Sequence, residues 1–107
     1  MKRVLFDHCV PKPLIRLLPG FEIRTCYEEG WDALRNGELL AVAEAARFEV
    51  FVTADRNLRH QQNLNARIIA VIELPRNRLA TLLRLIPAIR RAITTIAPGG
   101  YIEIPMP

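Results

Sequence analysis

Short apolar segments alternate with longer amphipathic segments along this chain, and no other feature constrains the fold as strongly. Residues 3–6, 50–52 and 68–72 are almost wholly apolar, which predicts strands that are buried on both faces. Residues 21–25 alternate apolar and polar side chains, so we expect a strand with one solvated face near an edge of the sheet. Residues 101–104 follow a Pro-Gly-Gly turn and predict a final strand.

Helical spacing fills most of the sequence between the expected strands. We expect short helices over 14–18 and 56–64, and another helix that has Asn36 as its N-cap. The apolar stripe over 79–96 is the most regular in the chain, and Pro87 within it predicts a kink or a split, since proline clashes with the carbonyl one turn earlier. Strands that alternate with helices predict a three-layer α/β/α sandwich with a mainly parallel sheet.

The length and the charge of the chain limit its size class and its partners. A chain of 107 residues is expected to form a single domain over 1–107. Its 15 Lys and Arg residues against 11 Asp and Glu give a net charge of +4, mostly through arginine, which suits bidentate contact with phosphate. A solvated basic surface would explain the same excess of charge. Half of the residues are apolar, and together with the stripe over 79–96 this predicts a homodimer.

The sequence predicts a cytoplasmic protein without a membrane segment. The apolar stretch after the basic N-terminus stops at Asp7, too early for an export signal, and no apolar run approaches the roughly 20 residues that a membrane span needs. A zinc site built from His8, Cys9 and Cys26 is conceivable, but the chain has no CxxC or HxxxH spacing. We therefore expect the two cysteines to be reduced and structural.

Three acids are placed where an open parallel sheet binds its ligands. Asp7 and Asp55 directly follow the first and third expected strands. Ligands bind beyond the carboxyl ends of the strands where strand order reverses, so an order 2-1-3-4 would turn both carboxylates into one crevice. Glu38, in the first turn of a helix, joins them only if the loop 27–35 folds back across the strand ends. Three converging carboxylates need a cation, and hard oxygen ligands favour Mg²⁺ or Mn²⁺, which support phosphodiester hydrolysis.

Each of the three acids also has an ordinary structural explanation. Asp55 precedes a helix and could serve as its N-cap. Asp7 precedes a proline-containing turn, where aspartate is common, and Glu38 would favour a helix N-terminus through the helix dipole alone. Composition and spacing leave the structural and the catalytic interpretations open.

Five polar residues near these acids are candidates for substrate binding: His8, Arg56, Asn57, Arg59 and Gln62. His8 could be a proton shuttle, a metal ligand or a surface histidine. Arg56 and Arg59 suit phosphate at a helix start, although Arg59 lies one helical turn after Asp55 and could simply pair with it. Trp31 in the loop could stack on an unpaired base or pack the loop onto the domain.

Four short motifs resemble, in their order along the chain, a family of small PIN-like proteins that are predicted ribonuclease toxins of bacterial toxin–antitoxin systems. They are Val4-Leu5-Phe6-Asp7, Asn36-Gly37-Glu38-Leu39-Leu40, Val52-Thr53-Ala54-Asp55 and Gln61-Gln62-Asn63-Leu64. The resemblance implies a PIN-like fold, dependence on Mg²⁺ or Mn²⁺, metal ligands at Asp7, Glu38 and Asp55, and a cognate antitoxin as partner. Many relatives carry further acids where this chain has His8 and Asn57.

Three functional hypotheses follow from these residues. The first is a metal-dependent endoribonuclease, the toxin of a toxin–antitoxin pair, in which Asp7, Glu38 and Asp55 are catalytic. The second is a catalytically degenerate PIN-like module that binds RNA or a protein, which His8 and Asn57 in place of acids would favour. The third, a phosphoacceptor domain, normally has an acidic pair after the first strand and a late lysine, and this chain has neither.

Overall fold

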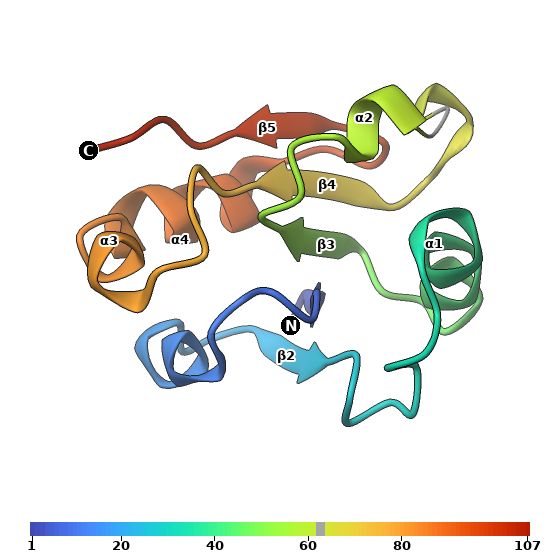
Figure 1. Ribbon diagram of the computed structural model, residues 1–107, viewed down its shortest axis with the longest axis horizontal. Coiled ribbons are helices and arrows are strands. Elements are labelled where there is room, and N and C mark those ends of the chain that lie inside the picture. Colours follow the sequence, from blue (N-terminus) through green and yellow to red (C-terminus); the bar gives the residue numbers. More distant parts are fainter. Residues whose placement is uncertain (62–63) are drawn as a thin grey trace.

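A parallel sheet of five strands organises the chain (Figure 1). The computed structural model describes residues 1–61 and 64–107. The strands are β1 (Arg3–Phe6), β2 (Glu22–Thr25), β3 (Val50–Thr53), β4 (Ala70–Glu73) and β5 (Tyr101–Glu103). Their order across the sheet is β2-β1-β3-β4-β5, so the direction of winding reverses between β1 and β3. This order contains the arrangement 2-1-3-4 under which Asp7 and Asp55 are expected to face one crevice.

Helices cover both faces of the sheet. One apolar cluster joins Val4, Phe6 and Val52 to the 3-10 helix η1 (Lys12–Leu17) and to helices α3 (Leu79–Leu83) and α4 (Ile86–Thr95). The second cluster joins Leu5 and Phe51 to α1 (Asn36–Ala45) and to the short helix α2 (Leu58–Gln61). Figure 1 shows α3 and α4 on one side of the strands and α1 on the other. The chain is thus an α/β fold, compatible with the expected three-layer arrangement.

The burial of the strands follows the sequence pattern. All residues of β3 and β4 are buried, while β2 and β5 lie at the two edges and keep partly exposed side chains. The expected solvated edge strand is β2. A further 3-10 turn, η2 (Leu64–Ala66), precedes β4. In the described part of the chain, no helix has the length and apolar character needed to cross a membrane.

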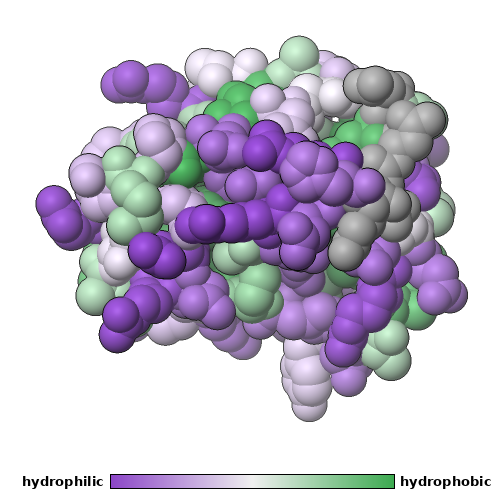
Figure 2. All heavy atoms as spheres, turned by 45° about the horizontal axis from the view of Figure 1, so that its top comes forward, coloured by the Kyte–Doolittle hydropathy of each residue, from purple (hydrophilic) through white to green (hydrophobic). Residues whose placement is uncertain are grey.

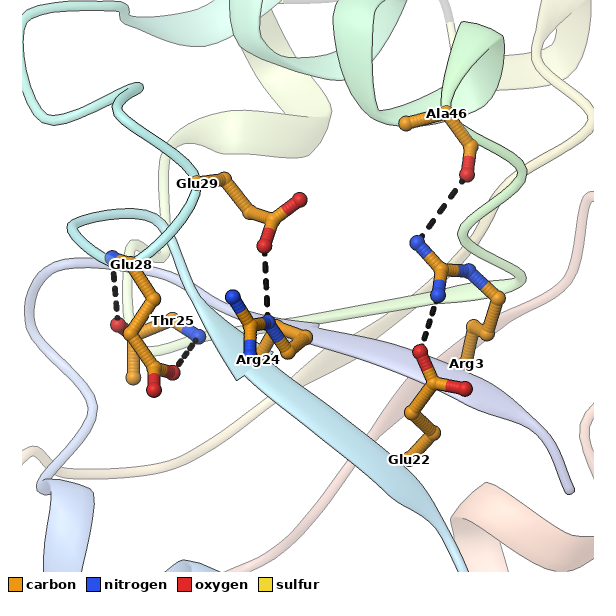
Figure 3. A network of polar contacts seen from close by, with 7 residues as sticks. All are labelled: Arg3, Glu22, Arg24, Thr25, Glu28, Glu29 and Ala46. Atoms are coloured by element: carbon orange, nitrogen blue, oxygen red, sulfur yellow. Dashed lines mark hydrogen bonds and ion pairs between the residues drawn. The ribbon is translucent and has the colours of Figure 1, made fainter.

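The edge strand β2 leads into a loop that polar contacts hold in place (Figure 3). Thr25 and Glu28 form a capping box: the Glu28 backbone N–H donates to Thr25 Oγ1 at 3.1 Å, and the Thr25 N–H donates to Glu28 Oε1 at 2.9 Å. The latter bond lowers the pKa of Glu28 below its usual value. Arg24 Nε donates to Glu29 at 2.8 Å, and Arg3 pairs with Glu22 across the two strands. The contacts of Arg24, Thr25 and Glu28 fix the start of the loop 27–35, whereas the Arg3–Glu22 pair joins the other ends of β1 and β2.

Pro87 splits the last amphipathic stretch into two helices, as the sequence predicts. Helix α3 ends at Leu83, and α4 begins at Ile86 with the proline in its first turn, where the missing N–H costs nothing. Most of the apolar stripe over 79–96 packs into the core, including Leu82, Ile89 and Ile93. The stripe therefore contributes less free apolar surface than expected.

Several element boundaries differ from the prediction by a few residues, and the helix expected over 56–64 begins only at Leu58. Two further differences bear on the site. Asn36 is the first residue of α1 rather than its N-cap; Arg35 occupies the N-cap without a side-chain cap, and Asn36 has a left-handed φ of 46°. Strand β4 begins at Ala70, two residues later than expected, although Ile68 and Ile69 are β-branched. Ile68 is 77% exposed, and its N–H bonds to a side chain instead of a neighbouring strand.

That side chain is Glu44, which ties helix α1 to the start of β4. Its carboxylate accepts hydrogen bonds from the N–H groups of Ile68 and Ile69 at 2.6 and 3.0 Å and from Arg67 Nη1 at 3.0 Å. Burial alone would raise the pKa of Glu44, but these three bonds together lower it below its usual value. The ionised carboxylate therefore holds the turn that delays β4.

We expect Glu44→Gln to weaken the acid dependence of folding. A carboxylate with a lowered pKa contributes stability that is present above its unfolded-state pKa, about 4.3, and is lost as pH falls through its folded-state pKa. Urea denaturation between about pH 6 and about pH 3 should therefore show a smaller loss of unfolding free energy in this variant than in the wild type. Glu22→Gln, which leaves Glu44 intact, is the control. Equal acid dependence of wild type and Glu44→Gln would contradict this role.

Candidate metal centre

Asp7 and Asp55 follow neighbouring strands at the point where strand order reverses. The Asp7 N–H donates to the Val52 carbonyl at 2.9 Å, so the pairing between β1 and β3 continues through Asp7. Side chains alternate along a strand, which places the Asp7 side chain on the face of Leu5, the face that α1 covers. Asp55 lies two residues beyond Thr53, the last residue of β3. The two acids thus come together as the sequence predicts.

The hydroxyl of Thr53 connects the two acids. Its side chain is fully buried, and Oγ1 donates to Asp7 Oδ2 at 2.7 Å while it accepts from the Asp55 N–H at 3.0 Å. The other carboxylate oxygen of Asp7 accepts from the His8 N–H at 2.8 Å. A single buried group therefore sets both the orientation of the Asp7 carboxylate and the path of the chain at Asp55.

Both acids line one small pocket beside α1. Its volume is about 60 Å³, and its lining residues are Asp7, Arg35, Asn36, Leu39, Phe51, Asp55 and Leu58. Carboxylate oxygens suit Mg²⁺, which commonly uses one or two protein carboxylates and completes its shell with water and substrate phosphate. The donors present at this pocket therefore fit a hard divalent cation.

Glu38 lies near this pocket but outside its lining. It is exposed in the first turn of α1, between two residues, Asn36 and Leu39, that do line the pocket. The oxygens of Asp7, Glu38 and Asp55 do not form a group within 4.8 Å of one another among the residues that the structure describes. The structure thus brings two of the three predicted ligands together and leaves the third on the neighbouring helix.

Arg35 is the pocket residue that the sequence analysis did not identify. The end of the loop 27–35 reaches the carboxyl ends of the strands, because Arg35 lines the same pocket as Asp7 and Asp55. Within the loop, the Trp31 N–H bonds to the Cys26 carbonyl at 2.9 Å and the Trp31 ring packs edge-on against Phe48. Arg35 Nη1 then lies 3.3 Å from His8 Nε2 and donates to the Asp32 and Leu34 carbonyls at 2.9 and 3.0 Å. The sequence feature that could have identified Arg35 is its position directly before Asn36-Gly37-Glu38, the segment that carries the third predicted ligand. Trp31 has the packing role of the two considered.

The proposed substrate-binding residues at the start of α2 have structural partners. The Asn57 N–H donates to Asp55 Oδ1 at 2.9 Å, a capping contact that uses one oxygen of the acid. Arg56 Nη2 donates to the Pro75 carbonyl at 2.8 Å. Arg59 pairs with Glu103 at 3.1 Å rather than with Asp55. Gln62 lies outside the described residues.

A buried acid on β4 was not predicted. Glu73 is only 3% exposed and accepts a hydrogen bond from the Tyr101 hydroxyl. Burial and this bond raise the pKa of Tyr101 above its usual value. Glu73 pairs in register with Thr53, so it lies one strand away from the Asp7–Thr53 contact. The sequence predicts a strand that ends at residue 72, whereas β4 extends to Glu73 and so includes it in the sheet.

Sulfur and imidazole donors also lie close to the Asp7 carboxylate. Both cysteines are free thiols, and burial raises the pKa of Cys26 to about 12, with a further contribution from Asp7. Burial also raises the pKa of Cys9, against a hydrogen bond from the Ala54 N–H. In the described part of the chain, the donor atoms of Asp7, His8 and Cys26 lie within 4.8 Å of one another. Sequence spacing alone did not predict this group.

We expect Thr53→Val to destabilise the fold and the site together. Valine has nearly the same shape but leaves the Asp7 carboxylate and the Asp55 N–H without their buried partner, at a cost of about 1–3 kcal/mol in the free energy of unfolding. Thr53→Ser keeps the hydroxyl and should cost less. Urea denaturation measures both variants. A valine variant as stable as the wild type would show that the hydroxyl contributes nothing to this arrangement.

Comparisons of the chain with protein-family models, with curated proteins and with solved structures gave no match.

Proposed function

We propose that this protein is a metal-dependent endoribonuclease whose metal is held by Asp7 and Asp55. The observation that carries the proposal is that both acids line one small pocket at neighbouring strand ends, where the Thr53 hydroxyl donates to the Asp7 carboxylate and accepts the Asp55 backbone N–H. Glu38, exposed in the first turn of α1, is the third ligand of the proposed site.

The residues of the pocket have separate roles in the proposed reaction. When bound, Mg²⁺ or Mn²⁺ supplies a Lewis acid for the phosphodiester and for the attacking water. Asp7 and Asp55 hold the cation, and Thr53 keeps the Asp7 carboxylate in position. Asp55 keeps Oδ2 for this purpose, because its capping contact to Asn57 uses Oδ1.

Arg35 is the residue best placed to bind the substrate phosphate. Its guanidinium lines the same pocket as the two acids, and the Asp32 and Leu34 carbonyls hold it there. A guanidinium carries five N–H donors in a fixed plane, so donors remain for a phosphate oxygen. The net charge of +4 and the resemblance to PIN-like toxins support RNA as the substrate. A cognate antitoxin that covers the site belongs to the same proposal.

A second function, RNA or protein binding without cleavage, is favoured by one observation. The exposed Glu38 does not line the pocket, and His8 and Asn57 stand where many PIN-like proteins carry further acids. The site then offers two carboxylates and one guanidinium, which could bind a phosphate through a cation without activating water. Cleavage and metal binding must therefore be measured separately.

We expect Asp7→Asn and Asp55→Asn to abolish Mn²⁺-dependent cleavage of single-stranded and transfer RNAs while the circular dichroism spectrum stays unchanged. Each substitution removes a charged metal ligand but keeps the side-chain shape. Asp32→Asn, an exposed position in the loop, is the matched control and should retain cleavage. Loss of activity in all three variants would contradict the assignment of the two ligands.

The same variants test metal binding without any substrate. At one hundred times its dissociation constant, an ion that binds only the folded state adds about 2.7 kcal/mol of stability, which should raise the melting temperature by about ten degrees or more. Asp7→Asn should remove most of this shift. A clear shift without cleavage by the wild type would favour the binding module. Identical melting curves in chelator and in Mn²⁺ would contradict the metal site.

We further propose a homodimer that forms through η1 and α3. These two elements pack against each other and carry the exposed side chains Leu17 (41% exposed) and Leu83 (45% exposed). Figure 2 shows a different side, that of β5 and α2, where hydrophilic side chains dominate and apolar areas are small and scattered. The exposed leucines of η1 and α3 are the apolar surface that we assign to the contact.

Light scattering at high micromolar concentration should give the mass of a dimer, and Leu83→Glu should give that of a monomer, because a buried carboxylate at the interface is costly. Ile68→Glu places the same charge on an exposed residue at the start of β4 and should stay dimeric. A monomeric wild type would contradict the proposal.

A further inference from the structure

We propose that Asp7, His8 and Cys26 form a zinc site that is distinct from the Asp7–Asp55 pocket and shares Asp7 with it. The donor atoms of the three side chains lie within 4.8 Å of one another, and they comprise one carboxylate oxygen, one imidazole nitrogen and one sulfur. Thiolate and imidazole are the ligands that zinc prefers, whereas Mg²⁺ and Mn²⁺ take oxygen. The chemistry of this group therefore differs from that of the first pocket.

The backbone fixes two of the three zinc ligands. The Cys26 N–H donates to the Phe6 carbonyl at 3.1 Å, which extends the pairing of β2 with β1 by one residue. The Asp7 N–H in turn donates to the Val52 carbonyl at 2.9 Å on the other side. Cys26 and Asp7 are thus adjacent residues at the ends of paired strands, and the distance between them depends on the sheet rather than on a mobile loop.

His8 is the solvent-facing ligand. It is exposed, and one of its ring nitrogens lies within 4.8 Å of the donor atoms of Asp7 and Cys26. All three side chains line a second pocket, of about 530 Å³, that includes Thr25, Tyr27 and Asp32 and gives an ion a path from solvent. Three protein ligands with a solvent molecule in the fourth position form a common tetrahedral zinc arrangement.

Cys9 does not belong to this site, although it is the other cysteine of the chain. Its sulfur accepts the Ala54 N–H at 3.4 Å and contacts Asp7 Oδ2 at 3.9 Å. Its sulfur is therefore held toward β3 and is not part of the close donor group, although Cys9 also lines the pocket of about 530 Å³. The chain has two cysteines and two histidines, so each proposed soft ligand has one residue of the same type as its control: Cys9 for Cys26 and His60 for His8.

Sharing Asp7 has a functional consequence, and this part of the inference rests on the proposed nuclease. When the Asp7 carboxylate binds zinc together with Cys26 and His8, it is no longer available to the cation in the Asp55 pocket. Zinc then inhibits the Mn²⁺-dependent reaction by competing for a ligand rather than by competing with RNA.

Cobalt is the probe for the site, because thiolate bound to Co²⁺ gives a near-ultraviolet charge-transfer band that oxygen-only sites lack. The reduced full-length wild type should show this band on titration with Co²⁺. Cys26→Ser should abolish it, and His8→Ala should weaken the affinity by about tenfold or more. Cys9→Ser and His60→Ala should match the wild type. No band in the wild type, or a band lost with Cys9→Ser and kept with Cys26→Ser, would overturn the site.

Folding of the variants is checked by circular dichroism. If Cys26→Ser does not fold, the exposed His8→Ala variant decides the matter, since an unchanged Co²⁺ affinity there overturns the site. One equivalent of Zn²⁺ should reduce RNA cleavage by the wild type and reduce that of Cys26→Ser much less, each relative to its own zinc-free rate. Equal inhibition of both overturns the sharing of Asp7.

The zinc site and the nuclease fail in different ways. A wild type that binds Co²⁺ but cleaves no RNA supports the zinc site and contradicts the proposed nuclease. A wild type that cleaves RNA but shows no cobalt band overturns the zinc site and leaves the nuclease standing.

Discussion

The pairing of β1 with β3 is the contact on which the rest of the molecule depends. Both strands are buried on both faces, so their apolar side chains supply one cluster below η1 and α4 and a second below α1. Because the winding direction reverses at this pair, the chain leaves the two strands toward opposite faces and opens a crevice at their carboxyl ends. The same register that packs Leu5 beside Phe51 places Asp7 beside Thr53. The register between β1 and β3 therefore determines both the packing of the core and the position of Asp7 in the candidate site.

Much of this arrangement could be predicted from the sequence, because it depends on the spacing of apolar residues and on the order of strands and helices along the chain. Apolar runs without a polar face specify central strands, and the alternating run that became β2 specifies an edge. Pro87 has a single steric consequence wherever it lies in a helix, so the division between α3 and α4 also followed. Asp7 and Asp55 came together because parallel strands all end at the same side of the sheet, whatever the details of packing.

The remainder depended on contacts between residues far apart in the sequence. Ile68 has a strong preference for a strand, yet Glu44 on α1 takes its N–H, and local preference cannot anticipate a partner that the fold supplies. At its other end, β4 extends one residue beyond the expected strand, to Glu73, which pairs in register with Thr53. The left-handed φ of Asn36 similarly reflects how the loop 27–35 returns to the sheet. The sequence contains the T-x-x-E pattern of a capping box at Thr25 and Glu28. Its role in directing the loop 27–35 could not be predicted, because that role depends on where β2 lies in the sheet.

The order of the sheet also determines the chemistry available to Asp7. A residue at the end of an interior strand has two neighbours, and here they differ: Thr53 on β3 offers a hydroxyl, and Cys26 after β2 offers a sulfur. The first neighbour favours a carboxylate held for a hard cation, and the second favours a donor set for a soft one. One carboxylate cannot serve both proposed ions fully, so the strand order predicts competition between them. Cys26 directly follows the edge strand β2 and is buried under the loop. A small apolar residue would fill the same space, but the cysteine thiol also offers a sulfur donor.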